Sequence, residues 1–130
     1  MKKIISILCS LLCLIGCSEP AEQKLSYRQI NMDEAISMME TEKDYIILDV
    51  RTIEEFSDKH IPGAICIPNE TIGTEEIPEL PDKDQLIMIY CRSGNRSKQA
   101  SEKLVNLGYT NIVEFGGIID WPGETMSGNN

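Results

Sequence analysis

The stretch that decides the fold is Leu86-Ile87-Met88-Ile89-Tyr90, followed without a break by Cys91-Arg92-Ser93-Gly94-Asn95-Arg96-Ser97. The first five residues form a continuous apolar run, which is typical of a strand buried on both faces of a parallel sheet. From Ser97 to Leu107, apolar residues recur at helical spacing, and Gly108 then supplies a stop. This stretch therefore predicts a buried strand, a short loop and an amphipathic helix.

Strand and helix patterns alternate on both sides of this unit. Strands are predicted over residues 25–30, 45–50, 64–67 and 112–115. One helix is predicted after Asn31, which forms a capping-box pattern with Glu34, and a shorter one over residues 52–57. Residues 69–84 are acidic and interrupted by prolines, which favours a surface loop with one helical turn. Alternation of this kind predicts an α/β fold.

Length and charge limit the possible functions. The 130 residues suit one domain, 42% of them are hydrophobic, and 25% are charged. Twelve basic and twenty-one acidic residues give a net charge of −9, which becomes −11 when Lys2 and Lys3 are removed with a leader segment. So acidic a surface repels a phosphate backbone, and nucleic acid is therefore not expected as a partner.

The amino terminus has the pattern of a processing signal. Lys2 and Lys3 precede the uncharged, apolar residues 4–16, which are too few for a membrane span but fit the core of a secretory signal. The run ends Leu14-Ile15-Gly16-Cys17, which resembles the bacterial lipobox. That resemblance implies a signal peptide over residues 1–16, cleavage before Cys17, and acyl chains of the palmitate type on Cys17. Two or more chains would hold the protein stably on the extracytoplasmic side of the cell envelope.

The alternatives for this segment are an ordinary cleaved signal, in which Cys17 has no role, and an uncleaved core helix. Residues 17–23 are polar and are interpreted as a tether, and residues 24–126 as the folded domain. Cys66 and Cys91 are then the cysteines of that domain, which is too few for a disulfide scaffold. His60 is the sole histidine, so neither a metal site nor a cofactor is expected.

The loop after the strongest strand carries the chemistry. In an open α/β sheet, ligands bind at the carboxyl ends of the strands, and a loop leading into a helix directs backbone N–H groups towards an anion. A cysteine at the first position of such a loop is stabilised as a thiolate by the helix terminus and by nearby arginines. Cys91 is therefore predicted to be a nucleophile, with Gly94 allowing the tight turn and Arg92 and Arg96 supplying positive charge.

Several motifs together resemble the rhodanese-like domains. In chain order they are Asp49-Val50-Arg51, Glu55-Phe56, His60-Ile61-Pro62-Gly63-Ala64, Ile67-Pro68, the loop Cys91-Arg92-Ser93-Gly94-Asn95-Arg96-Ser97, Gly116-Gly117 and Trp121. The resemblance implies a central five-stranded parallel sheet with helices on both faces. It also implies sulfurtransferase chemistry of the thiosulfate sulfurtransferase type.

In that chemistry, Cys91 would take a sulfane sulfur from thiosulfate or a related anionic donor, releasing sulfite. It would hold the sulfur as a persulfide and pass it to a thiol or to cyanide. By position in the loop, Arg92, Ser93, Gly94, Asn95, Arg96 and Ser97 would bind the substrate, through their backbone amides and the two arginines. Among them, Arg92 is expected to meet a charged donor at the pocket mouth, and Arg96 to brace the loop carbonyls. No general base is evident in the sequence.

The remaining motif residues are interpreted as structural support. Asp49 and Arg51 are expected to form a buried hydrogen-bonded pair, His60 to lie in a turn, and Trp121 to anchor packing. Cys66 lies on an apolar strand and is interpreted as a small buried hydrophobic residue, although a resolving thiol for Cys91 is an alternative.

Two other functions compete with sulfur transfer. Dual-specificity phosphatases and arsenate reductases share the fold, but their loops are one residue longer than the spacing between Cys91 and Arg96, which suits sulfur better than phosphate. The second alternative is a non-catalytic persulfide or thiol sensor, or an adaptor tethered at the envelope. The intact cysteine and both arginines favour an enzyme.

Overall fold

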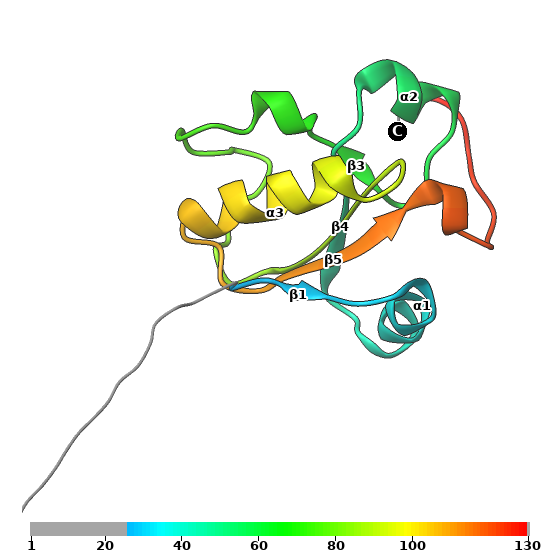
Figure 1. The fold of residues 1–130 in the computed structure, drawn as a ribbon, viewed down its shortest axis with the longest axis horizontal. Helices are drawn as coiled ribbons and strands as arrows, with labels where there is room; N and C mark the ends of the chain where they lie inside the picture. Colours follow the sequence, from blue (N-terminus) through cyan, green and yellow to red (C-terminus); the bar gives the residue numbers. More distant parts are fainter. Residues whose placement is uncertain (1–25, 130) are drawn as a thin grey trace, which may run out of the picture.

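The computed structural model of the protein describes residues 26–129, whose five strands form one parallel sheet in the order β1-β5-β4-β2-β3 (Figure 1). The strands are β1 (Arg28–Gln29), β2 (Tyr45–Asp49), β3 (Ile65–Cys66), β4 (Leu86–Cys91) and β5 (Ile112–Gly117). The helices are α1 (Met32–Thr41), α2 (Ile53–Asp58) and α3 (Asn95–Asn106), with short 3-10 turns η1 (Asn69–Thr71) and η2 (Ile118–Asp120).

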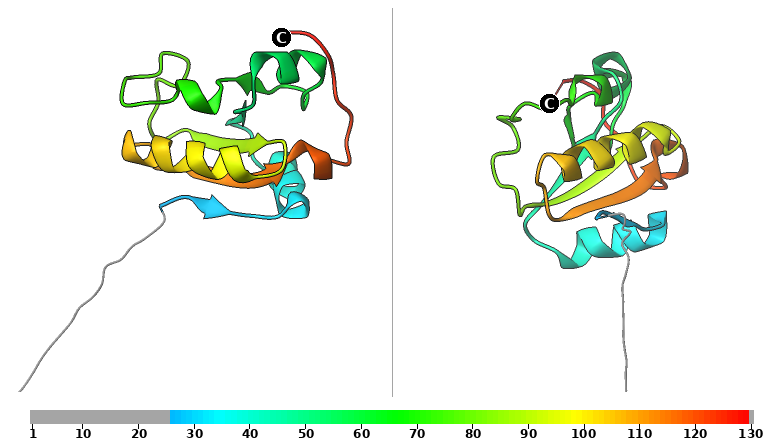
Figure 2. Two further views of the ribbon diagram at one scale, coloured as in Figure 1. Left: turned by 45° about the horizontal axis from the view of Figure 1, so that its top comes forward. Right: turned by 60° about the vertical axis from the view of Figure 1, so that its left-hand side comes forward.

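Helices cover both faces of this sheet, as the sequence predicted. Side chains of β4 alternate, because successive residues of a strand point to opposite faces. Ile87 and Ile89 pack with Leu104 of α3, whereas Met88 packs with Ala35 of α1 on the other face. Figure 2 shows α3 and α1 on opposite sides of the strands. Burial on both faces explains why β4 is apolar throughout.

A capping box begins each of the helices α1 and α2, which pack on the same face of the sheet as Met88. The side chain of Asn31 accepts from the backbone N–H of Glu34, whose carboxylate accepts from the N–H of Asn31. Thr52 and Glu55 make the same reciprocal pair at the start of α2. Each box satisfies two backbone donors that a helix otherwise leaves unpaired.

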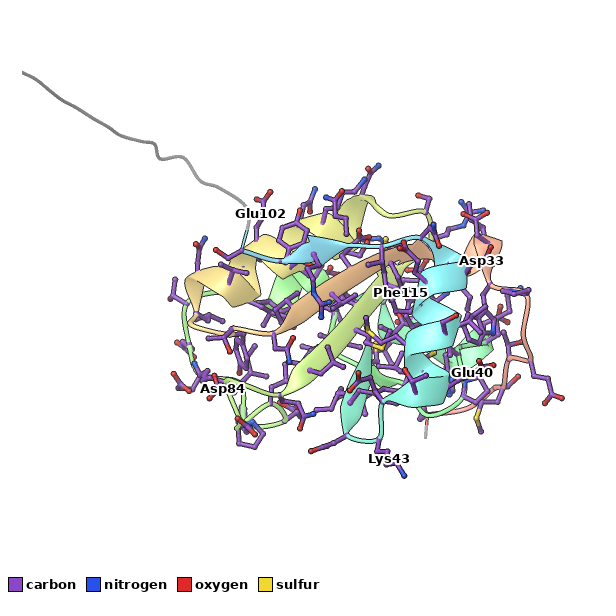
Figure 3. The ribbon with its side chains drawn as sticks, turned by 90° about the horizontal axis from the view of Figure 1, so that it is seen from below. Asp33, Glu40, Lys43, Asp84, Glu102 and Phe115 are labelled. Carbon is purple, nitrogen blue, oxygen red and sulfur yellow. The ribbon has the colours of Figure 1, made fainter. Side chains whose placement is uncertain are left out.

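α1 lies across the face of the sheet that carries Phe115 of β5 (Figure 3). Its buried side contacts the sheet through Ala35, while Asp33 and Glu40 are exposed (Figure 3). Met38 and Met39 are half-buried and pack against the same cluster.

Several boundaries differ from those predicted. Of the strand predicted over residues 25–30, the structure shows β1 at Arg28–Gln29, since the chain turns into the cap of α1 at Asn31. The strand predicted over residues 64–67 is likewise reduced to β3, which lies at the opposite edge of the sheet and pairs with β2 alone. α3 begins at Asn95 rather than at Ser97, because the left-handed Gly94 turns the chain directly into the helix.

The carboxyl-terminal segment returns to α2 (Figure 1). His60 and Met126 exchange two backbone hydrogen bonds of 2.8 and 3.0 Å, and the N–H of Gly128 donates to the carbonyl of Ser57 at 2.8 Å. The tail therefore fastens the end of α2 to the rest of the domain.

The predicted signal peptide, the tether over residues 17–23 and Cys17 all lie outside the described residues. Within residues 26–129, every helix is too short or too polar to span a bilayer.

Candidate active site

Three parallel strands end at the same edge of the sheet and bring the loop that begins at Cys91 close to the residues that support it. β4 ends at Cys91, β2 ends at Asp49 and leads directly to Arg51, and β5 ends at Gly117. Gly117 touches the loop so closely that a Cβ atom there would lie 1.9 Å from the carbonyl oxygen of Arg92. The N–H of Ile119 also donates to that oxygen at 3.3 Å. The end of β5 therefore forms one wall of the active-site loop.

The sulfur of Cys91 lies inside the loop. The residue is 1% exposed, and its Sγ accepts a hydrogen bond of 3.0 Å from the backbone N–H of Gly94. Gly94 has a φ of 115°, a left-handed conformation that glycine adopts without steric cost. The thiol itself lies 3.4 Å from the hydroxyl oxygen of Ser97, to which it can donate. An inward-facing amide and a hydroxyl are suitable partners for a sulfur anion.

The other loop residues divide between surface and interior. Arg92, Ser93 and Asn95 are exposed, whereas Gly94 and Ser97 are buried. Of the predicted loop residues, Gly94 and Ser97 contact the Cys91 sulfur, whereas the side chains of Arg92, Ser93 and Asn95 are exposed.

Arg96 has a different partner from the one expected. Its guanidinium makes two hydrogen bonds to the carboxylate of Glu55 on α2, at 2.7 and 3.1 Å, and among the described residues it does not brace the loop carbonyls. The prediction of a carbonyl brace was therefore wrong, because Glu55 offers a full negative charge in a two-point geometry. The hydrogen bond with Arg96 lowers the pKa of Glu55 to about 2, and Glu55 in turn raises the pKa of Arg96.

A pocket of about 250 Å³ opens beside the loop. Its lining combines three cations, two carboxylates and two apolar side chains: Arg51, Lys59, Arg92, Glu55, Asp58, Ile118 and Ile119. Arg92 is the loop residue that reaches this lining, whereas Cys91 is not one of the lining residues. The exposed guanidinium of Arg92 is thus the cation that the loop presents to this pocket.

Asp49 and Arg51 form the predicted buried pair. The Arg51 guanidinium donates to both carboxylate oxygens of Asp49, with a closest distance of 2.7 Å, and also to the carbonyl of Lys59. Although burial by itself lowers the pKa of Arg51, Asp49 more than offsets it and the pKa is raised. This pair joins the end of β2 to the end of α2.

His60 is structural, as predicted. Its ring is fully buried, stacks on Phe56 at 3.7 Å between centroids, and donates from Nδ1 to the carbonyl of Phe56 at 2.8 Å. Trp121 is half-buried and packs on the α1 and α2 side of the sheet, consistent with a packing role.

Cys66 differs partly from the expectation. It is half-buried rather than buried, and both cysteines of the described residues are free thiols. Burial raises the pKa of the Cys66 thiol to about 11, which makes it a poor nucleophile at neutral pH.

Glu114 is the residue that the sequence reasoning missed. It lies on β5, is 2% exposed, and accepts hydrogen bonds from the Ser97 hydroxyl at 2.5 Å and from the N–H of Gly116 at 3.0 Å. The available signal was an acidic residue inside the apolar strand that begins Ile112-Val113. A carboxylate is stable there only with such donors.

Among residues 26–129, no three His, Cys, Asp or Glu side chains are grouped closely enough to hold a metal ion.

The fold and the site define a class of parallel α/β domains with a buried cysteine at the start of a strand-to-helix loop. Residues 31–123 match the model of the Rhodanese-like domain family, and the chain belongs to that family. The chain is 37% identical over 73 residues to the thiosulfate sulfurtransferase PspE of Escherichia coli, covering 56% of this chain and 70% of that protein.

A longer relative and a solved structure agree with this assignment. The adenylyltransferase and sulfurtransferase uba4 of Ogataea parapolymorpha is 32% identical over 101 residues, which are 75% of this chain but only 26% of that protein. The crystal structure of a rhodanese-like domain protein from Staphylococcus aureus aligns with a TM-score of 0.64 and 31% identity, covering 77% of this chain and 97% of that one.

Proposed function

We propose that this domain is a sulfurtransferase that moves a sulfane sulfur from thiosulfate or a related anion, through a persulfide on Cys91, to a thiol or to cyanide. The observation that carries the proposal is the position of the Cys91 sulfur, which is held by the N–H of Gly94 and lies beside the Ser97 hydroxyl. Sulfur transfer is also the activity named for the PspE relative.

The proposed reaction has two displacements on sulfur. The Cys91 thiolate attacks the outer sulfur of thiosulfate, an S–S bond forms, and the original S–S bond breaks with its electron pair leaving on sulfite. The acceptor then attacks the outer sulfur of the persulfide and returns the Cys91 thiolate. Arg92 lines the pocket and supplies the charge that attracts the dianionic donor.

Persulfide formation can be read directly by mass spectrometry. Treating the purified full chain in detergent with thiosulfate is expected to add about 32 Da, one sulfur, to the Cys91 peptide. Cys91→Ser should carry no added mass, while Cys66→Ser should behave as the unmodified protein. An added mass that persists in Cys91→Ser would show that the nucleophile is another residue.

Two parallel turnover assays separate sulfur transfer from its alternatives. Thiocyanate should form from thiosulfate and cyanide, and no phosphate should be released from an aryl phosphate. Phosphate release without thiocyanate would favour a phosphatase, and neither product together with an unmodified Cys91 would favour a non-catalytic adaptor.

We also propose that Cys17 carries a lipid anchor that holds the domain on the extracytoplasmic side of the cell envelope. The support is the Leu14-Ile15-Gly16-Cys17 pattern after an apolar run. Expression in a bacterium fed labelled palmitate should label the protein, and Cys17→Ser should abolish the label. Equal labelling of both forms would contradict the anchor.

A further inference from the structure

The carboxylate of Glu114 is a buried charge for which the fold alone gives little reason. It is 2% exposed, and among the described residues it forms no ion pair within 4.0 Å. Its two donors are the backbone N–H of Gly116 and the hydroxyl of Ser97, both on Oε2. A buried anion without an ion-pair partner is costly, and an apolar residue in such a place is often at least as stable.

A hydrogen-bonded chain connects this carboxylate to the nucleophile. The Cys91 thiol lies 3.4 Å from the Ser97 hydroxyl oxygen, and that hydroxyl lies 2.5 Å from Oε2 of Glu114. Ser97 is fully buried, so solvent does not interrupt the chain. A hydroxyl has one hydrogen and two lone pairs, and it can therefore accept from the thiol while donating to the carboxylate.

We propose that Glu114 is the proton acceptor for Cys91 and acts through the hydroxyl of Ser97. This inference rests on the proposed sulfur transfer and adds a group that deprotonates the thiol before attack. The S–H bond of Cys91 breaks as its proton bonds to the Ser97 oxygen, and the original hydroxyl proton passes to Oε2 of Glu114. The products are a thiolate and a neutral carboxylic acid, and no atom is oxidised or reduced.

The same chain then stabilises the anion that it has created. The neutral acid donates to Ser97, whose hydroxyl hydrogen is now free to point at the Cys91 sulfur. After the acceptor has removed the outer sulfur, the proton can return along the chain to Cys91. Each proton therefore stays inside the site during the cycle.

The fixed charges around Cys91 come from the loop and from α2. Arg96 interacts electrostatically with Cys91 and is held by Glu55, whose pKa of about 2 keeps it ionised at neutral pH. Arg92 is exposed at the pocket, and the Asp49–Arg51 pair closes on itself at the end of β2. These charges do not change between pH 5 and 8 on ordinary side-chain values.

The residues paired with Glu114 on the two neighbouring strands have no titratable side chain. Its neighbour on β1 is Gln29, and its neighbour on β4 is Ile89. Ser101, one turn after Ser97 on α3, uses its hydroxyl on the carbonyl of Ser97. Within the described chain, Cys91 is therefore the titratable group that the Ser97 hydroxyl links to Glu114.

Proton sharing has a signature that a structural carboxylate lacks. When one proton is shared by two groups, the pair holds a constant number of protons between its two titrations, so the thiolate fraction does not vary with pH there. An unshared thiol below its titration instead gains thiolate about tenfold per pH unit.

The test is the pH profile of Cys91 alkylation by iodoacetamide, read on the Cys91 peptide by mass spectrometry in the full chain in detergent. The alkylation rate of the unmodified protein should vary little with pH over the range between the two titrations of the pair. Glu114→Gln, which keeps the shape but cannot take the proton, should show a rate that rises about tenfold per pH unit over that range. Glu102→Gln removes an exposed carboxylate from the same α3 helix that carries Ser97 and should match the unmodified profile (Figure 3).

Ser97 variants give an independent reading of the chain. Ser97→Ala breaks it and should make the profile steep, whereas Ser97→Thr restores a hydroxyl and should return the flat profile. Thermal melting establishes that each variant is folded, and Ser97→Ala supplies the test where Glu114→Gln does not fold. Parallel profiles for the unmodified protein and both disrupting variants would overturn the proposal.

Alkylation needs no sulfur donor, so this result is separate from the proposed function. A flat profile in the unmodified protein that Glu114→Gln and Ser97→Ala make steep supports the shared proton even where no thiocyanate forms. Thiocyanate formation with a steep profile in the unmodified protein overturns the relay and leaves the sulfurtransferase proposal standing.

Discussion

The two loop arginines have different surroundings in the folded chain. Arg92 is exposed and lines the pocket, whereas Arg96 is half-buried and paired with Glu55. An exposed guanidinium beside a pocket can meet an anion directly. A guanidinium held by a carboxylate instead positions the helix from which it projects.

Arg92→Ala is therefore expected to act on donor binding. It should lower kcat/KM for thiosulfate by roughly 1–3 kcal/mol, mainly through KM, since it removes a charge-assisted hydrogen bond. Raising the salt concentration should reproduce part of the loss in the unmodified protein, because salt screens an exposed charge. An uncharged persulfide donor serves as the control and should be used equally well by both proteins.

Arg96→Ala is expected to impair every donor, charged or neutral, because it frees the start of α3 from α2. The decrease should appear in kcat as well as in kcat/KM, which separates it from Arg92→Ala. Initial rates with thiosulfate and with a neutral donor provide the comparison. If both variants lost activity by the same factor with thiosulfate and kept it with the neutral donor, Arg96 would share the donor-binding role of Arg92 and this division would be wrong.

At the scale of elements, the Glu55–Arg96 pair links α2 to the beginning of α3. Because the folded pKa of Glu55 is lowered to about 2, its contribution to stability is complete above its unfolded value of about 4.3 and is lost as pH falls towards 2. The difference in unfolding free energy between the unmodified protein and Glu55→Gln should therefore shrink from pH 5 towards pH 2. Urea denaturation at several pH values measures it.

Glu54→Gln is the matched control for that series, since Glu54 is exposed on the same helix. Its unfolding free energy should follow that of the unmodified protein at every pH. A constant difference between Glu55→Gln and the unmodified protein across the range would show that the ion pair does not stabilise the fold.

The contact between β5 and the loop leaves no room for a side chain at Gly117. Gly117→Ala would drive a methyl group into the Arg92 carbonyl, 1.9 Å away, and should destabilise the domain by about 1–3 kcal/mol and reduce sulfur transfer. Gly73→Ala places its methyl group in open space and should change stability by less than about 0.5 kcal/mol. Thermal unfolding and thiocyanate formation are the measurements, and equal effects of both substitutions would refute the contact.

At the scale of the whole molecule, the carboxyl-terminal tail connects the end of the chain to the end of α2. Residues 126–128 hydrogen bond to His60, Ser57 and Asp58 around the end of α2, which also carries Glu55. Deleting residues 125–130 should lower the unfolding free energy by about 1–3 kcal/mol, because several backbone groups of α2 and His60 lose their partners. Met126→Ala keeps the backbone bridge and should have a much smaller effect.

The activity of the deletion variant follows from the same contacts. A looser α2 should hold Arg96 less firmly, so thiocyanate formation should fall together with stability. If the deletion variant were active and had an unchanged melting temperature, the contacts of the tail with α2 would not stabilise the domain.

Local patterns in the sequence were sufficient for the parallel α/β class, the capping box at Asn31 and the loop around Cys91. A continuous apolar run predicts a doubly buried strand, and β4 has that environment along its whole length. The capping box of Asn31 with Glu34 was predicted because such a box depends on residues three apart. These features are set by neighbours in the chain, and so the chain alone reveals them.

Partners that lie far apart in the sequence were decided by the tertiary structure. Arg96 and Glu55 are 41 residues apart, and Ser97 and Glu114 are 17 apart, yet each pair is within hydrogen-bonding distance. The strand order β5-β4-β2 decides which strand ends and connecting helices meet at the loop. The spacing of residues in the sequence does not reveal that order. The sequence by itself therefore singled out Cys91 and its loop as the candidate site, whereas the fold determined which carboxylates lie beside Arg96 and Ser97, because only packing brings distant charges into contact.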